Sequence, residues 1–123
     1  MTDYLTVIEV LSIHADQIAR YGGSDGIRDM GLLEAALFRP QTGYYEDEIA
    51  QAAALWESMA QNHPFVDGNK RTAFAVTYTF LAINGLRITA APDDTFRFIM
   101  DGMEAREFSF DQLENWLREN TAS

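Results

Sequence analysis

Residues 69–84 of the chain read NKRTAFAVTYTFLAIN, and this stretch decides the fold class. If this stretch forms a helix, apolar side chains lie on almost all of its faces. The cations Lys70 and Arg71 lie in its first turn. A helix without a polar face belongs in the interior of a protein. Gly85 follows and favours a helix end at that point. We therefore expect a buried central helix over residues 69–84.

Five further helical patterns surround this stretch. Thr6 and Glu9 have the spacing of a capping box, and the helix behind them ends at Gly22-Gly23. The other four are a pattern between Asp29 and Pro40, one from about Asp47 to Gln61, one marked by Phe96, Ile99, Met100 and Met103, and one capped by Ser109. Residues 39–45 are expected to form a surface loop and residues 86–92 a short extended connection. The sequence predicts an all-α, compact bundle of about six helices, folded as a single domain over residues 1–123.

Composition narrows the functions that are open to the chain. No apolar run approaches the ~20 residues that a membrane helix needs, and the first residues lack the pattern of a signal peptide. The absence of cysteine fits a reducing cytoplasm. Nine basic against nineteen acidic residues give a net charge of −10, which opposes binding to nucleic acid and to anionic lipid. Any phosphate site must therefore rest on a local arrangement of charges.

The nine residues 63–71, HPFVDGNKR, supply such an arrangement at the start of the expected central helix. The first N–H groups of a helix lack internal partners, and the helix dipole adds positive charge there, so phosphate binds readily. Gly68 allows close approach to the backbone, and Asn69 can cap the helix or donate its amide. Lys70 and Arg71 add charge-assisted hydrogen bonds to phosphate oxygens.

Two further side chains of this segment suggest catalysis. Asp67 beside a phosphate site makes sense if Mg²⁺ bridges the carboxylate and the phosphate. His63 follows Trp56 by seven residues, which extends the inward stripe of the preceding helix, and its imidazole can accept a proton near neutral pH. The segment is typical of a phosphoryl- or nucleotidyl-transfer site. A well-capped loop, with His63 bonded to a backbone carbonyl and solvated cations, is the alternative.

The segment also resembles a known family. HPFVDGNKR is similar to the His-x-Phe-x-Asp-Gly/Ala-Asn-Lys-Arg signature of Doc (death-on-curing) toxins, a branch of the Fic superfamily, and IARYGGSDGIRDMGLLEAALFRPQ at 18–41 resembles their N-terminal half. The resemblance implies a Fic-like fold and a protein kinase that uses ATP and Mg²⁺ to phosphorylate a threonine of elongation factor Tu, which arrests protein synthesis. It implies His63 as general base, Asp67 as Mg²⁺ ligand, and Asn69, Lys70 and Arg71 as phosphate binders.

Other members of the superfamily transfer AMP to protein hydroxyls, and this chain departs from their pattern at two positions. Lys70 replaces their second glycine and Phe74 their second arginine. An AMP transferase and a non-catalytic binding module are the alternatives to a kinase. The resemblance also implies a toxin–antitoxin system, in which a small Phd-like antitoxin folds its disordered C-terminal segment onto the toxin. Within the chain itself, we expect Phe65 to anchor the loop and His14 to be a hydrogen-bonded core histidine.

Overall fold

The computed structural model describes all 123 residues, Met1–Ser123, and two-thirds of the chain is helical. The α-helices are α1 (Val7–Tyr21), α2 (Met30–Phe38), α3 (Glu48–Asn62), α4 (Asn69–Ile83), α5 (Pro92–Ala105) and α6 (Phe110–Glu119), with a 3₁₀ helix η1 (Arg39–Gln41) after α2. The prediction of an all-α bundle of about six helices is confirmed. None of these helices has the length and apolarity needed to cross a lipid bilayer.

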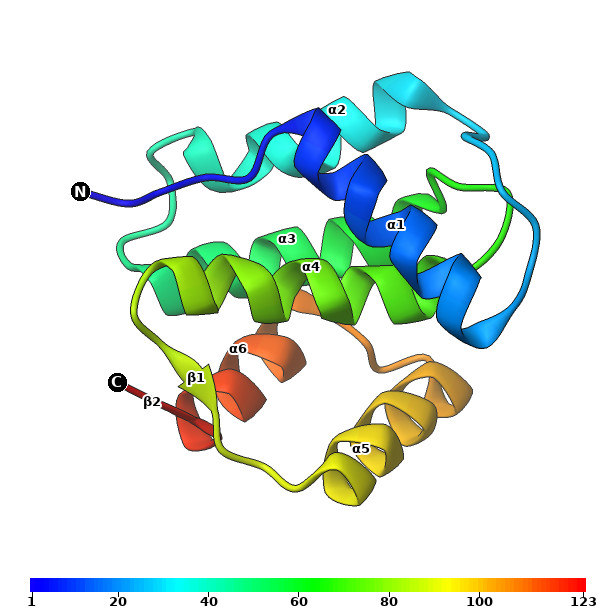
Figure 1. Ribbon diagram of the computed structural model, residues 1–123. Helices are drawn as coiled ribbons and strands as arrows, with labels where there is room; N and C mark the ends of the chain where they lie inside the picture. Colours follow the sequence, from blue (N-terminus) through cyan, green and yellow to red (C-terminus); the bar gives the residue numbers. More distant parts are fainter.

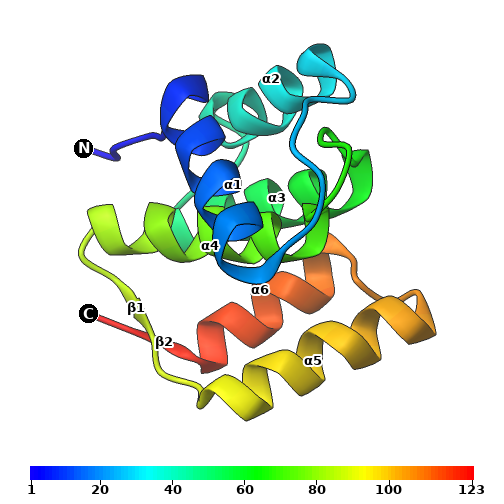
Figure 2. The ribbon, with the colours of Figure 1, turned by 45° about the vertical axis from the view of Figure 1, so that its right-hand side comes forward.

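The helices form three layers (Figures 1 and 2). Helices α1 and α2 cover one side of the pair α3 and α4, and α5 and α6 cover the other. The strands β1 (Arg87–Ile88) and β2 (Thr121–Ala122) pair antiparallel, with Arg87 opposite Ala122. The extended connection after α4 is thus confirmed, and the chain end supplies the partner strand that the sequence did not indicate.

Side-chain caps set the helix starts that the sequence indicated. The capping box of α1 is complete: the Glu9 main chain donates to Thr6 Oγ1 at 3.2 Å, and the Thr6 main chain donates to Glu9 Oε1 at 2.9 Å. The side chains of Asp29, Asp47 and Ser109 cap α2, α3 and α6 by accepting from one main-chain N–H each, without the reciprocal bond. Each cap gives an acceptor to an N–H group that has none inside its helix.

The most deeply buried helix is α3, which corrects the expectation for residues 69–84. Every residue of α3 from Ala50 to Ala60 is buried except Glu57. Helix α4 does lie in the middle layer, but Tyr78 is 49% and Ile83 42% exposed. The alanines of α3 have small side chains, which lets neighbouring helices approach it from several sides. Hydropathy alone therefore understates the burial of α3.

Trp56 of α3 packs α3 against α4 and against the layer formed by α5 and α6. It is fully buried, and four aromatic rings have centroids within 6.1 Å of its own, namely Phe74, Phe98, Phe108 and Trp116. These rings come from α4, α5, the segment before α6, and α6. Nineteen buried residues form one contiguous cluster around this contact. The core thus fixes α3 and α4, the two helices that flank the nine-residue segment.

Two segments differ from the sequence-based expectations. Residues 39–41 form η1 rather than loop, because Pro40 is buried and the Arg39 guanidinium reaches Glu57 Oε1 at 2.8 Å and Ser58 Oγ at 2.9 Å. Helix α5 begins at Pro92, since proline suits the first helical position. Two of its expected marker residues, Phe96 and Met100, are 66% and 41% exposed.

The Asp47 cap makes stability depend on pH. Partial burial of the Asp47 carboxyl by itself raises its pKa. The hydrogen bonds from the Ala50 main chain and from the Arg118 guanidinium outweigh this effect and hold the pKa below its usual range. A carboxyl with a lowered pKa stabilises the fold above its unfolded pKa, and this contribution is lost as the pH falls through the folded value. Asp47→Asn keeps a capping side chain but cannot titrate. At pH 7 we expect it to lower the free energy of unfolding by about 0.5 kcal/mol, since the pair is partly solvated.

Urea unfolding of the wild type and Asp47→Asn between pH 7 and pH 2 measures this difference. The gap between the two proteins should close below about pH 4, where the Asp47 carboxylate takes up its proton. A gap that stays constant down to pH 2 would contradict the assignment.

Candidate active site

The nine-residue segment lies where α3 ends and α4 begins. His63 follows the last residue of α3 with left-handed backbone angles, φ 50° and ψ 57°. Gly68 precedes α4 with φ 75° and ψ 19°. The predicted start of α4 at Asn69 is confirmed. The six predicted site residues, His63, Asp67, Gly68, Asn69, Lys70 and Arg71, therefore occupy one tight loop and the first turn of α4.

Asn69 holds the loop closed with both ends of its amide. Its Oδ1 accepts from the Phe65 main-chain N–H at 3.0 Å, and its Nδ2 donates to the Phe65 carbonyl at 2.9 Å. The cap position belongs to Gly68, so of the two expected roles for Asn69, capping the helix and donating its amide, only the second is seen. The Asn69 side-chain amide is used within the loop, while its main-chain N–H has no acceptor inside the helix.

Phe65 and His14 fix the loop to the core, as expected. Phe65 is 1% exposed, and the His14 ring stacks on it with centroids 3.8 Å apart and planes 5° from parallel. His14 Nε2 lies 2.8 Å from the Asp67 carbonyl oxygen, which can only accept, so Nε2 carries the proton and donates. The predictions of a buried anchor and of a hydrogen-bonded core histidine are confirmed.

The Asp67 carboxylate is exposed and ionised. It accepts from the Ser24 main chain at 3.1 Å and from the Gly68 main chain at 2.8 Å. These two N–H groups hold the pKa of the Asp67 carboxyl below its usual range. No three carboxylate or imidazole groups gather into a cluster that could hold a metal ion. A cation at Asp67 would therefore share its remaining coordination sites with water or with a ligand.

The segment between α1 and α2, residues 22–29, runs alongside the loop (Figures 1 and 2). The Val66 N–H donates to the Gly26 carbonyl at 3.0 Å, and Ile27 pairs with Phe65 in an antiparallel bridge. The N–H groups of Arg28 and Asp29 both donate to the Pro64 carbonyl, at 2.8 and 3.0 Å. Main-chain contacts thus hold the two segments together along their length.

The end of α3 departs from a regular helix at His63. The expectation that His63 extends the helical stripe of Trp56 is wrong, because the helix ends at Asn62 and His63 is left-handed and exposed. Arg28 binds the carbonyls at this end: its Nε donates to the His63 oxygen at 2.6 Å and its Nη2 to the Asn62 oxygen at 2.7 Å. Sequence reasoning missed Arg28, because 35 residues separate it from His63.

The amino end of α4 is open to an anion. Gly68 has no side chain to cap it, and the first N–H groups of any helix lack internal acceptors. Lys70 is exposed and forms no ion pair. Arg71 donates through Nη2 to the Gly22 carbonyl at 2.9 Å and lies 5.7 Å from the centre of the Tyr21 ring. The helix dipole and two cations therefore act at the same place.

The cations that have no acidic partner concentrate at this site. Ion pairs occupy four of the nine cations, namely Arg20, Arg39, Arg97 and Arg118. Of the other five, Arg28, Lys70 and Arg71 lie on or against the nine-residue segment. In a chain with a net charge of −10, the positive potential is thus local, as the composition required.

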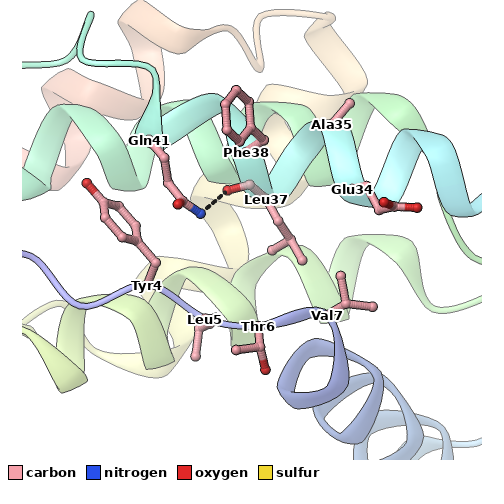
Figure 3. A pocket seen from close by; sticks show the side chains of 9 residues that line it. All are labelled: Tyr4, Leu5, Thr6, Val7, Glu34, Ala35, Leu37, Phe38 and Gln41. Carbon is pink, nitrogen blue, oxygen red and sulfur yellow. Dashed lines mark hydrogen bonds between the residues drawn. The ribbon is translucent and has the colours of Figure 1, made fainter.

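A separate groove lies away from the nine-residue segment, between the N-terminal residues 4–7 and α2 with the end of η1 (Figure 3). It encloses about 600 Å³ and is lined mainly by apolar side chains, with Gln41 bonded to the Leu37 carbonyl at its edge. No cationic side chain lines it. The groove does not have the charge that a phosphate ligand needs, so the open end of α4 is the better candidate for chemistry.

Comparison with known proteins gives one family and two relatives. The model of the Fic/DOC family matches residues 4–81, which contain the whole site. The chain is 43% identical over 119 residues to "Toxin Doc" of Mycolicibacterium smegmatis (strain ATCC 700084 / mc(2)155), covering 92% of this chain and 89% of the relative. It is 35% identical over 89 residues to "Protein kinase doc" of Escherichia phage P1, covering 69% of this chain and 71% of the relative.

Two glycines with similar φ angles test how closely the loop is packed. Gly68 has φ +75°, and a Cβ added there would lie 3.0 Å from Ile18 Cδ1 and 3.4 Å from Arg71 Nη2. Gly85 has φ +80° and no atom within 4 Å of the same position. Gly85→Ala should lower the free energy of unfolding by about 1 kcal/mol from backbone strain alone. Gly68→Ala should lower it by about 1 kcal/mol more, because the loop must also shift.

Urea denaturation of both variants measures the difference. Equal losses would contradict the close packing of Gly68 against α1.

Proposed function

Because the chain belongs to the Fic/DOC family, we propose that it is the toxin of a type II toxin–antitoxin pair and acts as an ATP-dependent Ser/Thr protein kinase. Its target in this proposal is a translation factor of the elongation factor Tu type, whose phosphorylation arrests protein synthesis. The observation that carries the proposal is the uncapped amino end of α4, with Lys70 and Arg71 in its first turn and His63 in the same loop.

The proposed phosphate cradle is made of main-chain and side-chain donors. The N–H groups of Asn69, Lys70 and Arg71 have no acceptor inside α4, so they are available to the terminal phosphates of ATP. Gly68 keeps the approach to these groups free of a Cβ. The Lys70 ammonium has no competing ion pair, and Arg71 retains N–H groups beyond the one bonded to Gly22. Each donor opposes the negative charge of the phosphoryl group.

His63 is the proposed general base. In the proposed phosphate transfer, the oxygen of a Ser or Thr hydroxyl on the target protein forms a bond to the γ-phosphorus of ATP. The bond from that phosphorus to the β–γ bridging oxygen breaks, and ADP leaves. The hydroxyl proton passes to the His63 imidazole. The exposed position of His63 supports this role, because a protein substrate must reach the ring from solvent.

Asp67 is the proposed residue that coordinates magnesium. Its carboxylate is exposed, is kept ionised by two main-chain N–H groups, and has lone pairs to spare on both oxygens. One carboxylate together with phosphate oxygens is a common magnesium environment in proteins. When bound, Mg²⁺ would neutralise phosphate charge and orient the terminal phosphates. The residues that hold Asp67 in place are Ser24, Gly68 and, through the Asp67 carbonyl, His14.

Two positions favour phosphate transfer over AMP transfer. Phe74 stands where the AMP transferases carry a second arginine, and its ring packs 5.5 Å from that of Trp56. Helix α4 therefore offers no guanidinium at this position for a second phosphate clamp. Lys70 adds a long cationic side chain where those enzymes have glycine. A relative in Escherichia phage P1 is named as a protein kinase, which supports the same choice.

The proposed partners follow from the family. We propose a small Phd-like antitoxin whose disordered C-terminal segment folds on the chain, as disordered segments do when they bury apolar side chains in a partner. A translation factor as target would place the chain in the cytoplasm. Both relatives carry Doc in their names, and one is named as a toxin.

Two labelled forms of ATP test the proposed reaction. The purified chain is incubated with elongation factor Tu, Mg²⁺ and ATP labelled at either the α- or the γ-phosphorus. We expect label from the γ position alone in the target protein. His63→Ala should slow the transfer by about 10²-fold or more, because it removes the proposed general base. Asp101→Ala, on the exposed side of α5, is the control and should keep the wild-type rate.

Transfer of the α label would identify an AMP transferase instead. Absence of both labels from elongation factor Tu and from every protein of a bacterial lysate would favour a non-catalytic binding module.

A further inference from the structure

The carbonyl groups at the end of α3 receive their hydrogen bonds from Arg28. The last carbonyls of a helix have no internal donors. In the common left-handed helix end, the N–H of the residue after the left-handed one closes back on the helix. Here the left-handed residue is His63, and the residue after it is Pro64, which has no N–H. The closing bond from the residue after the left-handed one is therefore impossible at this helix end.

Residue 28 supplies the missing donors. The Arg28 guanidinium donates to the Asn62 carbonyl at 2.7 Å and to the His63 carbonyl at 2.6 Å. The Arg28 main-chain N–H donates to the Pro64 carbonyl at 2.8 Å. A single residue thus binds the three consecutive carbonyls of Asn62, His63 and Pro64. The planar guanidinium can bind two neighbouring acceptors at once, which an ammonium cannot do with the same geometry.

Arg28 is itself held firmly. The Asp29 N–H also donates to the Pro64 carbonyl, at 3.0 Å, and the Asp29 carboxylate caps α2 by accepting from the Leu32 main chain at 3.0 Å. Leu33, which follows Leu32 in α2, is fully buried in the core. The contacts therefore run from the core through α2 and Asp29 to Arg28, and from there to the backbone of His63.

We infer that Arg28 is a positioning residue for His63. The catalytic part of this inference rests on the proposed function, in which His63 is the general base. Arg28 keeps His63 in its left-handed conformation and so directs the imidazole of the proposed base. His63 needs this support because a non-glycine residue adopts positive φ only at a cost. Arg28 is exposed, so its removal leaves carbonyls that water can reach. The expected loss is thus one of geometry more than of stability.

Kinetics of three variants separate positioning from binding and from folding. Arg28→Ala should lower kcat by about 10-fold or more, since small displacements of a catalytic group slow a reaction strongly. Its KM for ATP should stay within about 2-fold, because the cradle on α4 is intact, and its Tm should fall by less than about 5 °C. Arg28→Lys should have an intermediate kcat. Arg97→Ala, which removes an exposed arginine of α5, should match the wild type throughout.

Nuclear magnetic resonance of the ¹⁵N-labelled chain tests the inference without any enzymatic activity. In Arg28→Ala, the amide signals of His63 and Phe65 should shift or broaden, while those of Lys70 and Arg71 stay in place. Wild-type signals at His63 together with a wild-type kcat would overturn the inference. A raised KM for ATP with unchanged kcat would also overturn it, because Arg28 would then be a nucleotide-binding residue.

Two further outcomes are covered by the same measurements. If the wild type transfers no phosphate, the proposed function fails, and the His63 signals alone decide whether Arg28 holds this backbone. If Arg28→Ala does not fold, Arg28→Lys decides by the same signals and the same kinetic constants.

Discussion

The structure depends on one constraint: the loop between α3 and α4 must close without using the first N–H groups of α4. Loops usually end in a side-chain cap, which would occupy those groups. Here Gly68 stands at the cap position, and the Asn69 amide turns back to the Phe65 backbone instead. His14 holds the Asp67 carbonyl from the side of α1. The loop is therefore fixed from within and from the core, and the end of α4 stays open.

The charge around this open end differs from that of the rest of the chain. The chain carries nineteen acidic residues, which repel polyanions such as nucleic acid from most of its surface. Lys70 and Arg71 stand at the positive end of the α4 dipole, and the Arg28 guanidinium binds the end of α3 nearby in the loop. In the proposed function, this small region attracts a compact anion, the phosphate chain of a nucleotide. The match to the Fic/DOC family model covers residues 4–81, which include this region.

Local features of the chain were readable from its residues, while long-range contacts were not. The start of α4, the capping box of α1 and the burial of His14 follow from patterns within a few turns of a helix, and the burial of Phe65 follows from the nine-residue segment. The burial of α3 depends on which helices pack around its alanines. The pairing of β1 with β2 and the contact of Arg28 with His63 join distant segments, and a single sequence holds no local sign of such contacts.

A titration with nucleotide tests the central claim, that the amino end of α4 binds terminal phosphates, most directly. The ¹⁵N-labelled chain is titrated with ATP and Mg²⁺, and in parallel with AMP, which lacks the β- and γ-phosphates. The account predicts that ATP shifts the amide signals of residues 68–72 most strongly and that AMP shifts them far less. Signals that move only around the groove between residues 4–7 and α2, or equal shifts with AMP, would contradict it.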